Sequence, residues 1–188
     1  MKRLTALTLI LLLALTQGCY LFEEATVEIF PHDRIAKYYL SNLVSAPDRD
    51  NDVSRKERAE KDLKQFMENW NHNMEEVVFD VAIDSVLFKE LKIVHKKLNA
   101  SIIVRYKQIS NLTDTIKSGF FHIKLSEDNP IEHNGMEVII DSTKYAQWPE
   151  DTQKIILKYR NITVKNIHRQ RKYIRLGKLY QESLELKH

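Results

Sequence analysis

The sequence predicts an α+β domain in which two N-terminal helices pack on an antiparallel sheet of about five strands, with a C-terminal basic amphipathic segment. Apolar residues recur at helical spacing in two segments of the first half, whereas most of the later chain alternates between apolar and polar residues. Turn-forming residues separate the alternating runs. Alternation with one apolar side is typical of antiparallel strands that have one covered face. Helices followed by a run of strands favour the α+β class.

The two predicted helices cover residues 32–44 and 55–74. In the first, which follows Pro31, the residues near one helical face are Ile35, Tyr38, Tyr39, Asn42 and Leu43. The second follows a polar loop and begins with Ser54 and Glu57, which have the spacing of a capping box. Its apolar stripe consists of Leu63, Phe66, Met67, Trp70 and Met74. We expect this stripe to belong to the core.

The predicted strands are separated by turn signals such as Asn134-Gly135 and Trp148-Pro149-Glu150-Asp151. They cover residues 25–30, 79–84, 98–107, 120–125, 137–141 and 155–165. We expect the helices to cover the apolar face of the sheet. A conical arrangement similar to the nuclear-transport-factor-like or cystatin-like folds suits this order of elements, as a fold analogy alone.

Composition limits the function classes. The chain has 188 residues and a formal net charge of +3, and removal of residues 1–18 takes away Lys2 and Arg3 but no acid, which leaves +1. A body so close to neutral argues against a nucleic-acid-binding protein that relies on net charge. A length near that of one typical domain favours a single core. The single cysteine, Cys19, excludes an internal disulfide.

The N-terminus has the composition of an export signal. A basic start at Lys2 and Arg3 precedes an uncharged stretch from Leu4 to Phe22. A basic start, an apolar middle and a small residue at the cleavage point describe a secretory signal peptide. The sequence leaves open ordinary signal-peptidase cleavage and an uncleaved anchor, for which 19 uncharged residues are marginally long enough.

The stretch Leu15-Thr16-Gln17-Gly18-Cys19 resembles the lipobox of bacterial lipoproteins, in which a small residue precedes the lipid-bearing cysteine. It departs from the family at Thr16, where leucine is usual. Among the three alternatives, only this resemblance gives Cys19 a function. It implies that the thiol carries a diacylglycerol and that the new amine is acylated, for example by palmitate. By analogy with lipoprotein sorting, Tyr20 in place of aspartate implies the outer membrane, facing the periplasm.

These expectations divide the chain into three parts. Residues 1–18 form the signal peptide, residues 19–31 the lipidated cysteine with a short tether, and residues 32–188 a single α+β domain. If a strand begins at Ala25, only about five tether residues are free, reaching roughly 17 Å. The body is therefore expected to lie near the membrane, where it binds another protein of the cell envelope.

The body carries no motif for a cofactor or a metal. With three glycines after Cys19 it has no Gly-rich phosphate loop, and it has no HExxH or CxxC pattern. Asp80 and Asp84 share one face of a predicted strand, and paired carboxylates serve glycosidases. The competing interpretation is a solvated strand face balanced by Arg105 and Lys107. A hydrolase is therefore an alternative to a non-enzymatic protein, and the expected cofactor is none.

The C-terminal segment combines positive charge with helical periodicity. Its basic residues are Arg169, Arg171, Lys172, Arg175 and Lys178. Its apolar residues at helical spacing are Tyr173, Leu176, Tyr180 and Leu184, with Gly177 as a weak point of the helix. The basic cluster could bind anionic lipid head groups, peptidoglycan acids or a partner. The sequence thus predicts a non-enzymatic interaction or assembly protein, and the alternative is a small carrier or sensor with an apolar ligand between helices and sheet.

Overall fold

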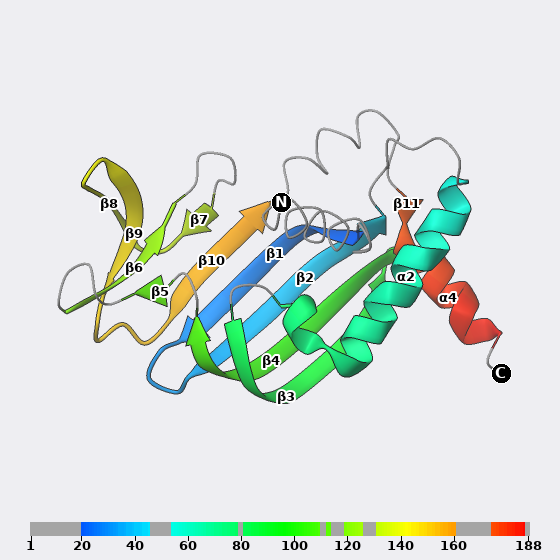
Figure 1. The fold of residues 1–188 in the computed structure, drawn as a ribbon, viewed down its shortest axis with the longest axis horizontal. Helices are drawn as coiled ribbons and strands as arrows, with labels where there is room; N and C mark the ends of the chain where they lie inside the picture. The colour runs from blue at the N-terminus through cyan, green and yellow to red at the C-terminus, as the bar shows by residue number, and fades with distance from the viewer. Residues whose placement is uncertain are drawn as a thin grey trace, which may run out of the picture.

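The computed structural model describes residues 20–45, 54–78, 81–109, 112–113, 119–125, 131–160 and 174–186. These residues form an α+β fold with one long curved sheet, a smaller sheet beside it and two helices on one face of the long sheet (Figure 1). The predicted class is therefore confirmed. Every strand pairing among the described residues is antiparallel, also as predicted.

The main sheet has seven strands rather than about five. Six of them follow the order β3-β4-β2-β1-β10-β7, and the seventh, β11, pairs with β2. Their bounds are β1 (Tyr20–Phe30), β2 (Ile35–Ser45), β3 (Val81–Val94), β4 (Lys97–Ile109), β7 (Ile131–His133), β10 (Ile155–Arg160) and β11 (Ile174–Arg175). The smaller sheet has the order β5-β6-β9-β8, with bounds β5 (Leu112–Thr113), β6 (Phe120–Lys124), β8 (Met136–Ile140) and β9 (Thr143–Pro149).

The segment predicted as the first helix, residues 32–44, consists of the end of a turn and most of the strand β2, so that prediction is wrong. Ala36, Tyr38 and Leu40 are buried and alternate with more exposed residues, which is the period of a strand. Their cross-strand partner is β1, and the chain reverses at residues 31–34, where Arg34 has a φ of +52°. Apolar residues in this segment occur at helical spacing and also at every second position, so its sequence fits a helix or a strand. Pairing with neighbouring strands decides for the strand.

The strand β1 confirms the predicted strand at residues 25–30 and extends it back to Tyr20. Val27 and Ile29 are buried on one face, as their alternation predicted. Glu24 and Thr26 pair with both neighbours, β2 and β10. Residues 20–24, which the sequence analysis left as the free part of the tether, thus also belong to a central strand of the main sheet.

The helix α2 (Arg55–His72) confirms the second predicted helix. Both bonds of the capping box are present: the Glu57 amide donates to Ser54 Oγ at 3.2 Å, and the Ser54 amide donates to the Glu57 carboxylate at 3.1 Å. Its buried residues are Ala59, Asp62, Leu63, Phe66 and Trp70. A short 3-10 helix, η1 (Met74–Glu76), follows it.

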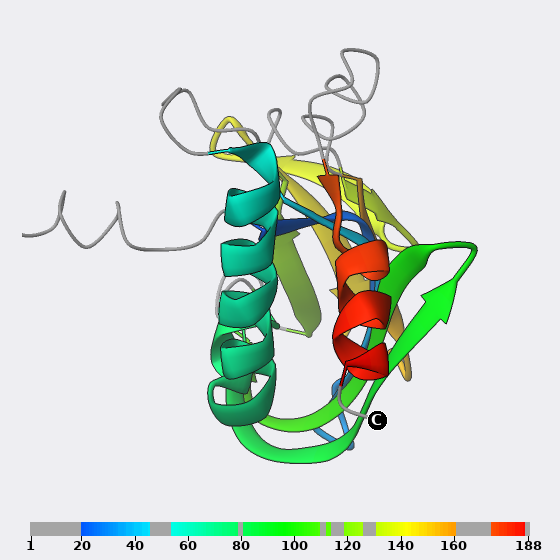
Figure 2. The same ribbon diagram turned by 90° about the vertical axis from the view of Figure 1, so that its right-hand side faces the viewer.

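The second helix, α4 (Leu176–Glu185), lies at the C-terminus, so the expectation of two N-terminal helices is wrong. The helical spacing in this segment did predict α4 itself. Figure 2 shows α2 and α4 side by side within the curve of the main sheet. A Cβ added at Gly177 would lie 2.5 Å from the carbonyl oxygen of Lys96, so glycine lets α4 approach the turn between β3 and β4 closely.

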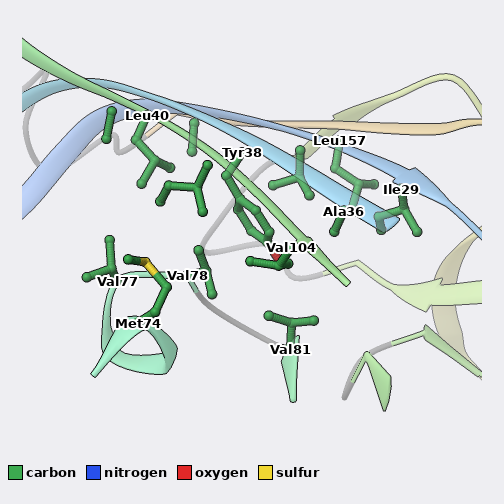
Figure 3. Packing of buried hydrophobic residues seen from close by; sticks show 14 of the residues in the cluster. Ile29, Ala36, Tyr38, Leu40, Met74, Val77, Val78, Val81, Val104 and Leu157 are labelled. Carbon is green, nitrogen blue, oxygen red and sulfur yellow. The ribbon is translucent and has the colours of Figure 1, made fainter. Parts of the chain in front are cut away.

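The apolar face of the main sheet and the segments over it form one core. The sheet residues on this face are buried to 3% exposure or less: Val27, Ile29, Ala36, Tyr38, Leu40, Leu98, Ala100, Ile102, Val104 and Leu157. Figure 3 shows Met74, Val77 and Val78 facing this layer from the segment after α2, and Val81 facing it from the start of β3. At about 1.5–3 kcal/mol for each fully buried large apolar side chain, this layer is a main source of stability.

Asn134 joins the two sheets. Its side-chain oxygen accepts from Trp148 Nε1 in β9 at 2.9 Å and from the Ile156 amide in β10 at 2.9 Å. The next residue, Gly135, lies so close to Trp148 that a Cβ there would be 2.5 Å from the indole ring. The predicted Asn134-Gly135 turn therefore also fixes Trp148, which is 2% exposed, at the boundary between the sheets.

Candidate functional site

Three strands bring distant parts of the chain together at one end of the main sheet. Tyr20, the first residue of β1, pairs with Ser45, the last residue of β2. Ser45 also pairs with Ile174, the first residue of β11. We call Tyr20, Ser45 and Ile174 the anchor end; it lies beside the upper half of α2 in Figure 1. Tyr20 directly follows Cys19 in the chain, while Cys19 itself lies outside the described residues.

Tyr20 is fixed against α2 by its ring and its hydroxyl group. The ring packs edge-on against Phe66 with centroids 5.3 Å apart, and Asn69 Nδ2 donates to Tyr20 Oη at 2.9 Å. Burial raises the pKa of the Tyr20 phenol, and the hydrogen bond from Asn69 opposes that rise. The first described residue after Cys19 is thus part of the core packing.

Ser45 is held by a buried side-chain hydrogen bond. Its Oγ donates to Asp62 Oδ2, and the two residues are each 3% exposed. A hydrogen bond to a charged group contributes about 1.5–3 kcal/mol, and a buried carboxylate without a partner is costly. The pair therefore locks the anchor end to α2. The sequence analysis missed both residues, although a charged Asp62 within an apolar helical stripe is a usable signal.

The predicted basic cluster is described only in part. Arg175 and Lys178 are exposed, and Arg169, Arg171 and Lys172 lie outside the described residues. Arg175 pairs with Val44, which in turn pairs with Leu21. Arg175 is thus placed at the same end of the sheet as Tyr20. Lys178 lies 3.4 Å from Glu182 on the exposed face of α4, a surface pair worth about 0.3–0.5 kcal/mol.

The predicted acid pair receives no structural support as a catalytic site. Asp84 is exposed and lies where the register of β3 shifts, between Ile83 and Ser85, and Asp80 lies outside the described residues. Residues four apart on an extended strand are about 13 Å apart, and glycosidase carboxylates are about 5–9.5 Å apart.

The sequence analysis did not single out two histidines, which lie in β6 of the smaller sheet (His122) and in β7 of the main sheet (His133). His122 is fully buried, its Nε2 lies 3.3 Å from Gln147 Oε1, and its Nδ1 has no hydrogen-bond partner among the residues that the structure describes. His133 lies 3.7 Å from Glu137, and Lys144, at 2.6 Å, lowers the pKa of that carboxyl. The ring of His122 lies 6.4 Å from that of Phe120 and 6.2 Å from that of Tyr145, between centroids.

Within the described ranges, no group of three or more histidine, cysteine, aspartate or glutamate side chains could hold a metal ion. Among these same residues, no helix is both long and apolar enough to cross a membrane. Comparisons with known proteins find no matching family model, no matching curated protein and no matching solved structure.

Proposed function

We propose that the protein is a bacterial lipoprotein of the cell envelope, anchored through Cys19, that acts by binding and performs no catalysis. The proposal rests on the lipobox-like stretch ending at Cys19 and on the place of the next residue. Tyr20 already belongs to β1 and packs on α2, so no described residue separates the body from the lipidated position as a flexible spacer. A body anchored in this way lies against the bilayer with its anchor end toward the lipid.

The energetics of the anchor suit a permanent attachment. Each buried methylene of an acyl chain contributes about 0.8 kcal/mol, and one chain alone gives only reversible binding. The three chains of a mature lipoprotein would hold the body firmly. Outer-membrane attachment facing the periplasm remains part of this proposal, on the basis of Tyr20 after Cys19.

The basic residues supply a second contact in the same direction. Arg175 is exposed at the anchor end, and Lys178 is exposed one turn of chain further along α4. With Arg169, Arg171 and Lys172 they form the cluster that the sequence predicts. Lysine or arginine near an anionic surface contributes about 1 kcal/mol each. We propose that this cluster binds lipid head groups or peptidoglycan acids beside the anchor.

A binding role for the body is also favoured by the composition of the described core, which is apolar and packed. The segments over the sheet contribute buried apolar residues, and the residues drawn in Figure 3 belong to one packed cluster. The polar groups that do meet in space, such as Ser45 with Asp62 and Asn134 with Trp148, hold elements together. These polar contacts join one element of the fold to another. Their structural role is consistent with the proposed non-enzymatic interaction protein.

The electrostatic part of the proposal can be tested with residues 20–188, which lack the lipid. In co-sedimentation with anionic vesicles at low salt, replacing Arg169, Arg171, Lys172 and Arg175 with serine should strongly reduce binding. The Asp80→Asn, Asp84→Asn double variant should bind like the wild type. Raised salt should weaken wild-type binding, because the screening length falls to about 8–10 Å at physiological salt.

A matched control removes the same number of charges elsewhere. Arg105, Lys107, Lys124 and Lys158 are exposed on other parts of the two sheets, and their replacement with serine should leave most of the binding intact. If both four-residue variants lost vesicle binding equally, the binding would depend on net charge and not on the C-terminal cluster. Absence of wild-type binding would leave the C-terminal cluster as a solvated surface.

A further inference from the structure

The outer edge of β3 pairs with no other strand among the described residues, and at Ile83 its amide donates to Glu75 instead. In the described part of the chain, β3 is the terminal strand of the main sheet and pairs only with β4. It runs for 14 residues, from Val81 to Val94, and Figure 1 shows it at the lower border of the sheet. A long edge strand is a template for pairing with another chain unless something disrupts it.

Only one half of this edge is disrupted. The register with β4 shifts between Ala82 and Ile83, between Ile83 and Ser85, and between Val86 and Phe88. Bulges of this kind twist a strand and discourage pairing. From Phe88 to Val94 the register is regular, with every residue in turn opposite a residue of β4. The second half of β3 is therefore an edge of regular register, suited to a further strand.

The side chains of this half present apolar and charged groups together. Phe88 is 46% exposed and Val94 is 39% exposed. Between them on the same face lie Glu90 and Lys92, both exposed and neither in an ion pair within the described ranges. On the helix-facing side Lys89 is already engaged, because its Nζ donates to the Trp70 carbonyl at 2.6 Å.

We propose that residues 88–94 of β3 pair antiparallel with the same residues of a second copy of this chain, which joins two main sheets into one. The two-fold axis passes through Leu91. In this register Glu90 faces Lys92 of the second copy, and Lys92 faces Glu90 of the second copy. Phe88 faces Val94 of the second copy at both ends. Opposite charges and apolar pairs directly across antiparallel strands are stabilising.

The self-complementary order of these residues favours a second copy over an unrelated strand. A slip of two residues in one direction places Glu90 opposite Glu90, and a slip of two in the other direction places Lys92 opposite Lys92. A slip of one residue turns the covered faces of the two sheets to opposite sides. The pattern Phe-Lys-Glu-Leu-Lys-Ile-Val thus selects one register, as an isologous interface requires.

The test exchanges charges in the full-length protein, extracted in a mild detergent and studied by sedimentation equilibrium. The wild type should form a dimer. Either Glu90→Lys or Lys92→Glu creates two like-charged pairs across the axis, and should raise the dimer dissociation constant by about tenfold. The double variant Glu90→Lys, Lys92→Glu restores opposite charges in both pairs, and should dimerise like the wild type.

A control places the same reversal on another exposed site. Glu150→Lys, in the turn after β9, should leave the dimer unchanged. Circular dichroism of each variant checks that the fold persists, as expected for exposed positions. A monomeric wild type at all concentrations would overturn the proposal, and so would single reversals without effect or a double variant that stays as weak as the singles.

Discussion

At the scale of single residues, Gly177 determines how closely α4 packs on the rest of the fold. A Cβ there would lie 2.5 Å from the Lys96 oxygen and 2.9 Å from the Leu98 nitrogen, both backbone atoms that cannot move independently of the hairpin. From the sequence, Gly177 is only a weak point of a helix, because helix propensity depends on the residue type and not on what the helix packs against. The close approach depends on which strand the helix meets, and the sequence does not contain that information in a local pattern.

Gly177→Ala separates these two effects. Helix propensity alone would stabilise the variant by about 1 kcal/mol, whereas overpacking against backbone costs about 1–3 kcal/mol. We expect the steric cost to exceed the propensity gain, with a net loss of about 1 kcal/mol in the free energy of unfolding. Denaturant unfolding measures it, and Lys178→Ala, next along α4 and exposed, is the control. A Gly177→Ala protein more stable than the wild type would show that α4 is free to shift away.

At the scale of elements, α2 is the helix on which both the core and the anchor end depend. Trp70 is 6% exposed, lies 5.9 Å from the Phe66 ring and carries Lys89 over its own ring at 5.5 Å. Trp70→Ala should therefore lower the free energy of unfolding by about 3–5 kcal/mol. Lys64→Ala, on the exposed face of α2, should change it little. An unchanged melting temperature in Trp70→Ala would show that α2 is peripheral.

The elements also show how far sequence patterns extend. For α2, the capping box and the apolar stripe agree, so its type and start were predictable. For β2, apolar residues occur at both helical and strand spacings, and its pairing with β1 and β4 decides the period. The second half of β3 was not predicted because an edge strand exposes apolar residues on both faces, which removes the alternation. The strand β9 was not predicted because its sequence gave no clear period.

At the scale of the whole molecule, the chain crosses the main sheet so that its N-terminal strand ends up in the middle. Tyr20 pairs with Ser45, 25 positions away in sequence, and Ser45 pairs with Ile174, 129 positions away. Such convergence cannot be read from local patterns, so the sequence predicted Cys19 and the basic residues separately but not the anchor end. The placement of Arg175 at the same end of the main sheet as Tyr20 follows from these long-range strand pairings.

The most direct test of this account is the mass of the mature N-terminus. The full-length gene is expressed in a Gram-negative host, and the N-terminal peptide of the membrane-bound protein is analysed by mass spectrometry. The account predicts that the peptide begins at Cys19 and carries three acyl chains, with labelled palmitate entering the wild type but not Cys19→Ser. A mature protein that retains Met1, or one that begins near Cys19 without lipid, would contradict it.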